Sequence, residues 1–115
     1  MISFELPWPP SINNYWRRHG NTYFISIKGK KYREDVVYSC FRYKDHFKDD
    51  VKISINIDAF PPDKRRRDLD NVLKALLDSL QHAKVFKDDN QIDRLYIARC
   101  MPLIGKVVVT LSECA

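Results

Sequence analysis

The segment that most constrains the fold is a strand followed directly by a helix, within residues 51–83. Apolar and polar residues alternate from Val51 to Ala59, a period typical of a β-strand with one buried face. Pro61 and Pro62 then end the strand. The next apolar residues recur at the i, i+3, i+4, i+7 spacing of an amphipathic helix: Leu69, Val72, Leu73, Leu76, Leu77, Leu80 and Ala83.

The rest of the chain adds strands and one further helix to this unit. Strands are expected at residues 2–6, 22–26, 91–101 and 106–112, and Ser26 is suited to cap a helix reaching about Tyr43. Residues 11–21 are expected to form a loop, and residues 102–105 to join the last two strands as an antiparallel hairpin. We therefore expect an α/β (α+β) fold, a single mixed β-sheet of about five strands with two helices packed on it, in one domain spanning residues 1–115.

The composition limits the class of protein. A hydrophobic fraction of 44% and a charged fraction of 30% argue against a disordered or a membrane chain. The formal net charge of +5 favours an acidic partner. Three cysteines without a CxxC pair argue against a disulfide scaffold or a zinc site and fit a reducing cytosol. With no leader and no apolar run of membrane-spanning length, a cytoplasmic protein is expected.

The loop between the predicted strand and helix carries charges of both signs. Four consecutive cations directly precede two carboxylates: Lys64, Arg65, Arg66 and Arg67, then Asp68 and Asp70. A second acidic pair, Asp88 and Asp89, follows the helix. Cations neutralise phosphates, and carboxylate oxygens are the ligands that Mg²⁺ prefers. The pattern predicts metal-dependent cleavage of a nucleic-acid backbone, with one or two Mg²⁺ ions per site and Lys74 stabilising charge on the phosphate or the leaving oxygen.

Each acidic residue also has an ordinary structural interpretation. Aspartate is favoured at a helix N-terminus, Asp70 and Lys74 have the spacing of an i, i+4 ion pair, and residues 88–90 have the composition of a turn. The basic run is also compatible with a solvated loop. The helix would separate Asp70 from Asp89 by about 20 Å. A site that uses both therefore requires the chain to double back or a second subunit to contribute.

The chain resembles the RusA-like Holliday junction resolvases, small endodeoxyribonucleases of bacteria that prophages often carry. The resemblance covers most of the chain and rests on LPWPPSINNYW, SIKGKKYREDV, PPDKRRRDLDNVLKALLDSL and VFKDDNQI. It implies a homodimer that binds a four-way DNA junction and makes paired, symmetric, Mg²⁺-dependent nicks in recombination and repair. No organic cofactor and no membrane partner are expected.

The same resemblance implies roles for individual residues. Asp68, Asp70 and Asp89 match the metal-binding, catalytic carboxylates of the family, and Lys74 matches its catalytic lysine. The DNA-contacting basic run falls on residues 64–67, where a lysine at the first position replaces a common arginine and loses its bidentate fork. The polar and aromatic segment near the N-terminus adds two candidate DNA contacts, Arg17 and Arg18.

Other functions stay open on the sequence alone. A non-catalytic module that binds branched DNA is disfavoured, because carboxylates without a metal would repel DNA. An unspecific Mg²⁺-dependent nuclease has the same residue pattern as a resolvase. An enzyme of phosphorylated metabolites is disfavoured by the absence of a Gly-rich phosphate loop. Tyr15 and Trp16 would either stack on bases at the junction centre or cover the core, and we expect the second role.

Overall fold

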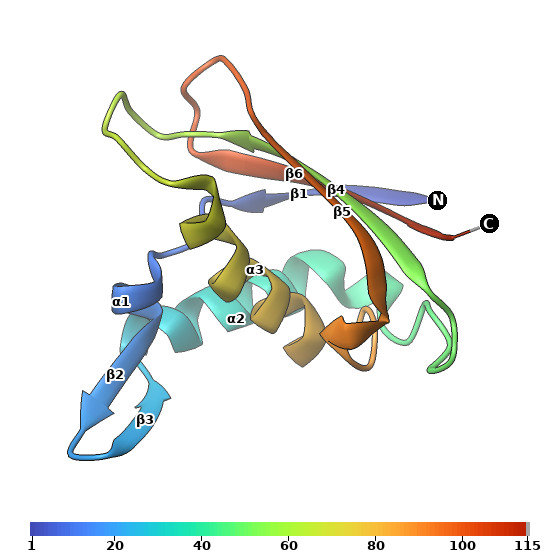
Figure 1. Ribbon diagram of the computed structural model, residues 1–115, viewed down its shortest axis with the longest axis horizontal. Helices are drawn as coiled ribbons and strands as arrows, with labels where there is room; N and C mark the ends of the chain where they lie inside the picture. Colours follow the sequence, from blue (N-terminus) through green and yellow to red (C-terminus); the bar gives the residue numbers. More distant parts are fainter. Residues whose placement is uncertain (115) are drawn as a thin grey trace.

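Four strands of the computed structural model, which describes residues 1–114, form one mixed sheet in the order β1-β6-β4-β5 (Figure 1). Helices α2 and α3 lie together against one face of this sheet (Figure 1). The elements in chain order are β1 (Ile2–Pro7), α1 (Ile12–Tyr15), β2 (Trp16–His19), β3 (Thr22–Ile25), α2 (Ile27–Cys40), η1 (Phe41–Tyr43), β4 (Ile53–Phe60), α3 (Leu69–His82), η2 (Asp89–Gln91), β5 (Ile92–Arg99) and β6 (Lys106–Glu113), where η marks a 3₁₀ turn. The expected α+β class is confirmed.

The core lies between the sheet and the two helices. β4 runs through the middle of the sheet, and its apolar positions are buried as the alternation predicts: Ile53, Ile55, Ile57 and Ala59. α2 contributes Tyr32, Val36 and Cys40, and α3 contributes Val72, Leu76 and Leu80. Because β4 and α3 are both fixed by this core, the loop between them is held by rigid elements at both ends.

The expected hairpin of the last two strands is wrong. β5 pairs parallel with β4 at the sheet edge, whereas β6 pairs antiparallel with β4 on its other side and with β1 beyond it. α3 carries the chain back along β4, so β5 must run in the direction of β4. Residues 100–105 then cross two strand spacings, about 10 Å, around the end of β4. Backbone hydrogen bonds fix this crossing, from Cys100 N–H to the Ala59 carbonyl (2.8 Å) and from Gly105 N–H to the Pro61 carbonyl (3.2 Å).

Residues 11–21 do not form the expected loop. They form the short helix α1 and the strand β2, which pairs antiparallel with β3 in a ribbon separate from the main sheet. Gly20, with a φ of 62°, makes the tight turn between β2 and β3. Ser26 caps α2 as expected and accepts a hydrogen bond from Gly29 N–H at 2.9 Å. Of the two aromatic residues expected to cover the core, Tyr15 is fully buried, whereas Trp16 is only half-buried.

Among residues 1–114, no helix combines the length and the apolar character that crossing a membrane requires.

Candidate active site

Two of the predicted catalytic carboxylates lie at the start of α3. Asp68 is its N-cap residue and Asp70 lies in its first turn, and both are exposed. The Asp68 side chain makes no capping hydrogen bond. Neither carboxylate forms an ion pair with any of residues 1–114, and Lys74 does not pair with Asp70. A helix cap and an i, i+4 ion pair therefore do not account for these side chains, and their oxygens are free to bind a cation.

Asp68 lies where three segments meet: the basic loop, the start of α3, and residues 8–14. Two surface hollows of about 240 and 320 Å³ share Asp68 in their walls, together with Trp8, Arg65 and Arg67. Asn71 faces the N-terminal segment and accepts a hydrogen bond from the Ile12 N–H at 3.4 Å. The N-terminal motif therefore forms one wall of the candidate site. The sequence gives no separate indication that Trp8 and Asn71 belong to the site, beyond their position inside the segments LPWPPSINNYW and PPDKRRRDLDNVLKALLDSL.

The basic loop has three free cations and one that is engaged. Lys64, Arg65 and Arg66 are exposed and form no ion pair with any of residues 1–114. Arg67 pairs with Asp63 at 2.7 Å and its guanidinium lies 5.8 Å from the centre of the Trp8 ring. The hydrogen bond from Arg67, with a second from the Arg65 N–H, lowers the pKa of Asp63 to about 2.

The two acidic residues after α3 differ in role: the Asp88 carboxylate caps η2, whereas the Asp89 carboxylate is available to bind a ligand. Asp88 caps η2, where its carboxylate accepts from Asn90 N–H at 3.0 Å and its own N–H donates to the Gln91 side chain at 3.1 Å. Asp89 donates its backbone N–H to Oε1 of Gln81 at 2.9 Å. Its carboxylate is exposed and forms no ion pair within residues 1–114. The turn interpretation thus holds for Asp88 and leaves the Asp89 side chain available.

The structure keeps Asp89 at the opposite end of α3 from Asp68 and Asp70. Asp89 is attached to Gln81 in the last turn, and Asp70 lies in the first turn, so the helix separates them by about 16 Å. No group of three His, Cys, Asp or Glu side chains within residues 1–114 is arranged to hold a metal ion. The chain does not double back, so a single copy does not bring the three predicted ligands together.

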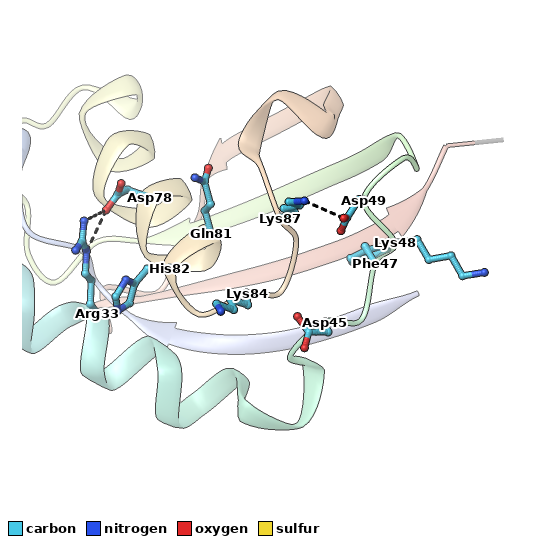
Figure 2. Close-up of a pocket in the computed structure, with 10 residues that line it drawn as sticks. All are labelled: Arg33, Asp45, Phe47, Lys48, Asp49, Asp78, Gln81, His82, Lys84 and Lys87. Atoms are coloured by element: carbon cyan, nitrogen blue, oxygen red, sulfur yellow. Dashed lines mark hydrogen bonds and ion pairs between the residues drawn. The ribbon is translucent and has the colours of Figure 1, made fainter.

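A polar cleft at the C-terminal half of α3 is distinct from this site. Its volume is about 630 Å³, and none of the predicted carboxylates lines it. Figure 2 shows that two of its charges are neutralised in place, since Arg33 reaches Asp78 (2.7 Å) and Lys87 reaches Asp49 (3.0 Å). These ion pairs connect neighbouring segments, and they leave fewer free charges here than at the start of α3.

The two remaining predicted DNA contacts lie on the β2–β3 ribbon. Arg17 and Arg18 are both exposed, and Nε of Arg18 donates to the Gly20 carbonyl at 2.7 Å. The base of the ribbon is held by Tyr15, whose hydroxyl donates to Asp78 and accepts from Nε of Arg33 at 2.8 Å. Burial and the hydrogen bond to the Asp78 carboxylate raise the pKa of the Tyr15 hydroxyl. The ribbon is therefore attached to α2 and α3 at its base and free at its tip.

Comparison with known proteins gives a consistent result over nearly the whole chain. The model of the endodeoxyribonuclease RusA family matches residues 7–112. The chain is 48% identical over 102 residues to the crossover junction endodeoxyribonuclease RusA of Enterobacteria phage HK97, covering 89% of this chain and 85% of that protein. The RusA protein of Enterobacteria phage 82 is 36% identical over 110 residues, which cover 94% of this chain and 91% of that protein. The RusA protein of Escherichia coli K12 is 34% identical over 113 residues, which cover 96% of this chain and 93% of that protein. All the predicted site residues fall inside the matched range, and the chain belongs to the RusA family of endodeoxyribonucleases.

Proposed function

We propose that this protein is an Mg²⁺-dependent endodeoxyribonuclease that resolves four-way DNA junctions by paired, symmetric nicks. The observation that carries the proposal is the pair of free carboxylates, Asp68 and Asp70, beside the free cations of residues 64–66. Concentrating four cations at the positive end of a helix gives no folding advantage, because they repel one another and the helix dipole. The printed names of the relatives, crossover junction endodeoxyribonucleases, support the same reaction.

The donor set fits a hard divalent cation. Asp68, Asp70 and Asp89 would hold it, since all three are exposed and none forms an ion pair within residues 1–114. A bound cation would neutralise charge on the scissile phosphate and lower the pKa of an attacking water. Lys74 lies one turn beyond Asp70 and is exposed, so its ammonium group can stabilise charge on the leaving oxygen. Lys64, Arg65 and Arg66, with the ribbon arginines, would bind neighbouring phosphates.

We also propose a homodimer in which Asp89 of one subunit completes the site of the other. The separation of Asp89 from Asp70 along α3 supports this arrangement, as does the lack of a three-ligand cluster in residues 1–114. β5 is an edge strand with exposed apolar residues, Leu95 (42%) and Tyr96 (58%), and a long exposed edge of this kind favours pairing with another chain. A two-fold junction also requires two equivalent cuts, which a two-fold dimer would provide.

The first test is Mg²⁺-dependent cleavage of a labelled four-way junction against a linear duplex of matched sequence. Paired nicks in the junction alone are expected, and Asp70→Asn should abolish them while leaving junction binding intact or tighter. Tight binding without cleavage under any divalent metal would indicate a binding module. Equal cleavage of both substrates would indicate an unspecific nuclease.

A mixed dimer tests the shared site. One subunit carries Asp70→Asn and the other carries Asp89→Asn. If each site takes Asp89 from the partner, one of the two sites contains both intact residues, and single nicks persist. If each site is built within one chain, both sites are defective and cleavage is lost.

A further inference from the structure

The β2–β3 ribbon presents exposed arginine and aromatic side chains in pairs. It extends from α1, away from the four-stranded sheet (Figure 1). Tyr23 is 64% exposed and Phe24 is 49% exposed. The register places Arg18 opposite Tyr23 and Arg17 opposite Phe24. Directly opposed residues share a face of an antiparallel pair, so each face of the ribbon carries one arginine and one aromatic ring.

The face that carries Arg18 and Tyr23 borders an open hollow between the ribbon and α1. The hollow has a volume of about 600 Å³ and is lined by Ile12, Asn13, Trp16, Arg17, Arg18 and Tyr23. The guanidinium of Arg18 lies 5.7 Å from the centre of the Tyr23 ring. The lining therefore combines aromatic rings and guanidinium planes, on which a flat ring can stack, with a carboxamide that can donate and accept hydrogen bonds.

The ribbon gains little folding stability from these rings. A two-stranded ribbon is marginally stable alone, and this one is held at its base, where the Tyr15 carbonyl accepts from Ser26 N–H at 2.9 Å. Tyr15 is buried, whereas Tyr23 and Phe24 are exposed. Exposed aromatic side chains grouped on one element indicate a binding surface.

The hollow is connected to the candidate active site through α1. The Ile12 N–H donates to Asn71, which belongs to the first turn of α3 beside Asp70, and Ile12 also lines the hollow. No acidic residue occurs between Glu5 and Glu34, so this part of the chain carries only positive charge. The positive charge of this segment favours the approach of a DNA strand from the carboxylates of α3 to the ribbon.

We propose that this hollow takes one unstacked nucleobase of the DNA beside the branch point, with the base stacked on Tyr23 and Arg18 and its edge toward Asn13. The inference rests on the proposed function for its substrate and adds a base-binding residue, Tyr23, to it. A π-face is common to all bases, so stacking tolerates any of them, and the carboxamide of Asn13 gives the hollow a group that can discriminate among base edges. A base at a branch point has a smaller unstacking cost than a base inside a continuous duplex.

The test is a double-mutant cycle that combines a protein substitution with an abasic site in the DNA. Junction affinity is measured in EDTA, where no metal-dependent cleavage occurs. The junction carries an abasic site at each nucleotide flanking the branch point in turn. For the parent protein, removing the base at the occupied position should weaken binding about 5- to 150-fold, the range found for base–aromatic stacking. Tyr23→Ala should weaken binding to the intact junction by a similar factor and then be insensitive to the abasic site. Tyr23→Phe, which retains the ring, should behave like the parent.

Phe24→Ala is the matched control, because it removes a ring of the same ribbon from the opposite face. This variant should keep the full effect of the abasic site. The proposal is overturned if the effects of Tyr23→Ala and the abasic site are additive at every position. It is also overturned if Phe24→Ala abolishes the coupling equally, or if Tyr23→Ala changes only the dissociation of the dimer in sedimentation, which would make the ribbon a subunit contact.

A second substrate separates this inference from the proposed function. A linear duplex with one unpaired nucleotide, with and without its base, repeats the cycle without a junction. Coupling between Tyr23 and the unpaired base would support the hollow as a base site even if the parent protein does not prefer junctions, a result that would contradict the proposed function alone. A junction preference with no coupling on either substrate would overturn the base site alone.

Discussion

The guanidinium of Arg67 lies 2.7 Å from the carboxylate of Asp63, and this ion pair folds the basic loop back on itself immediately before Asp68. The same guanidinium lies over the Trp8 ring, and the Arg67 carbonyl accepts a hydrogen bond from Arg99 at 2.6 Å. Arg67 is thus engaged on both its side chain and its backbone. Its charge is neutralised within the protein, unlike the charges of residues 64–66.

The four cations of the loop should therefore differ in their effect on DNA binding. Arg65→Ala and Arg66→Ala should each reduce the slope of log K against log salt by about 0.9, the value for one lost phosphate contact. Arg67→Ala removes the same formal charge but should leave the slope nearly unchanged. The measurement is junction affinity between about 50 and 200 mM salt in EDTA. A slope that falls equally in all three variants would show that Arg67 leaves Asp63 to bind phosphate.

The neighbours Asp88 and Asp89 should respond oppositely to the same substitution. Asp88→Asn keeps a good cap for η2, because a carboxamide oxygen can accept from Asn90 N–H as the carboxylate does. Cleavage should be little affected. Asp89→Asn should reduce cleavage by more than about 100-fold, since even outer-shell changes at metal sites cost about 10- to 100-fold. Cleavage rates at saturating Mg²⁺ on the junction provide the comparison, and equal losses in both variants would assign the two residues the same role.

The sequence predicted the central β–α unit well, because both of its elements have strong periodicity. β4 and α3 bury the residues that the pattern identified. The lateral order of the strands was not predictable in this way. The turn residues before β6 are compatible with a hairpin, and only the return of the chain through α3 places β4 between β5 and β6. Of the ribbon, β3 was expected as a strand at residues 22–26, whereas β2 was assigned to a loop. β2 was missed although Gly20 and Asn21 are typical of a two-residue turn, because it has no apolar alternation.

The sequence motif predicted which residues belong to the candidate site, but it did not predict which of their side chains are already engaged in contacts within the protein. The motif located Asp68, Asp70 and Asp89, and it could not distinguish Asp88 as a cap. It also assigned Arg67 to the same group as its neighbours. Two contacts distinguish Arg67: the ion pair with Asp63, four residues earlier, and the contact with Trp8, which lies far away in the chain and becomes a neighbour only in the folded protein. The contact with Trp8 has no local signature in sequence.

The free energy of unfolding should fall at alkaline pH. Burial raises the pKa of the Cys40 thiol from 9.0 to about 12, and burial also raises the pKa of the Tyr32 hydroxyl. The unfolded chain ionises the thiol at a pH where the folded chain keeps it protonated, so ionisation favours unfolding. The stability from Cys40 is fully present below pH 9.0 and decreases as pH rises toward about 12.

Urea unfolding at about pH 7.5 and about pH 10.5 measures this effect. The thiol alone should cost about 2 kcal/mol across that interval. Cys40→Ala removes the thiol, so its stability should fall less over the same interval, whatever its starting value. An identical decrease in the parent and in Cys40→Ala would show that other groups, such as Tyr32, cause the whole alkaline effect.

Gly29→Ala should destabilise the protein although alanine is the better helix former. An added Cβ would lie 2.6 Å from the Tyr15 carbonyl oxygen and 2.6 Å from Cγ1 of Ile25. The carbonyl is held by Ser26 N–H at 2.9 Å and cannot move without displacing the junction of α1 with the ribbon. Helix propensity offers at most about 1 kcal/mol in favour of alanine, while overpacking costs about 1–3 kcal/mol. The balance is against the substitution.

Lys30→Ala is the control for this prediction, since it also introduces alanine into α2, at the exposed position that follows Gly29. Its free energy of unfolding should stay within about 0.5 kcal/mol of the parent. Junction affinity should fall in Gly29→Ala, because the displaced segment carries the ribbon arginines, and Lys30→Ala loses at most the electrostatic effect of one charge. A more stable Gly29→Ala with unchanged affinity would mean that α1 is not fixed against α2 at Tyr15. The ribbon would then be a mobile arm, and its approach to the DNA would not depend on the packing of its base.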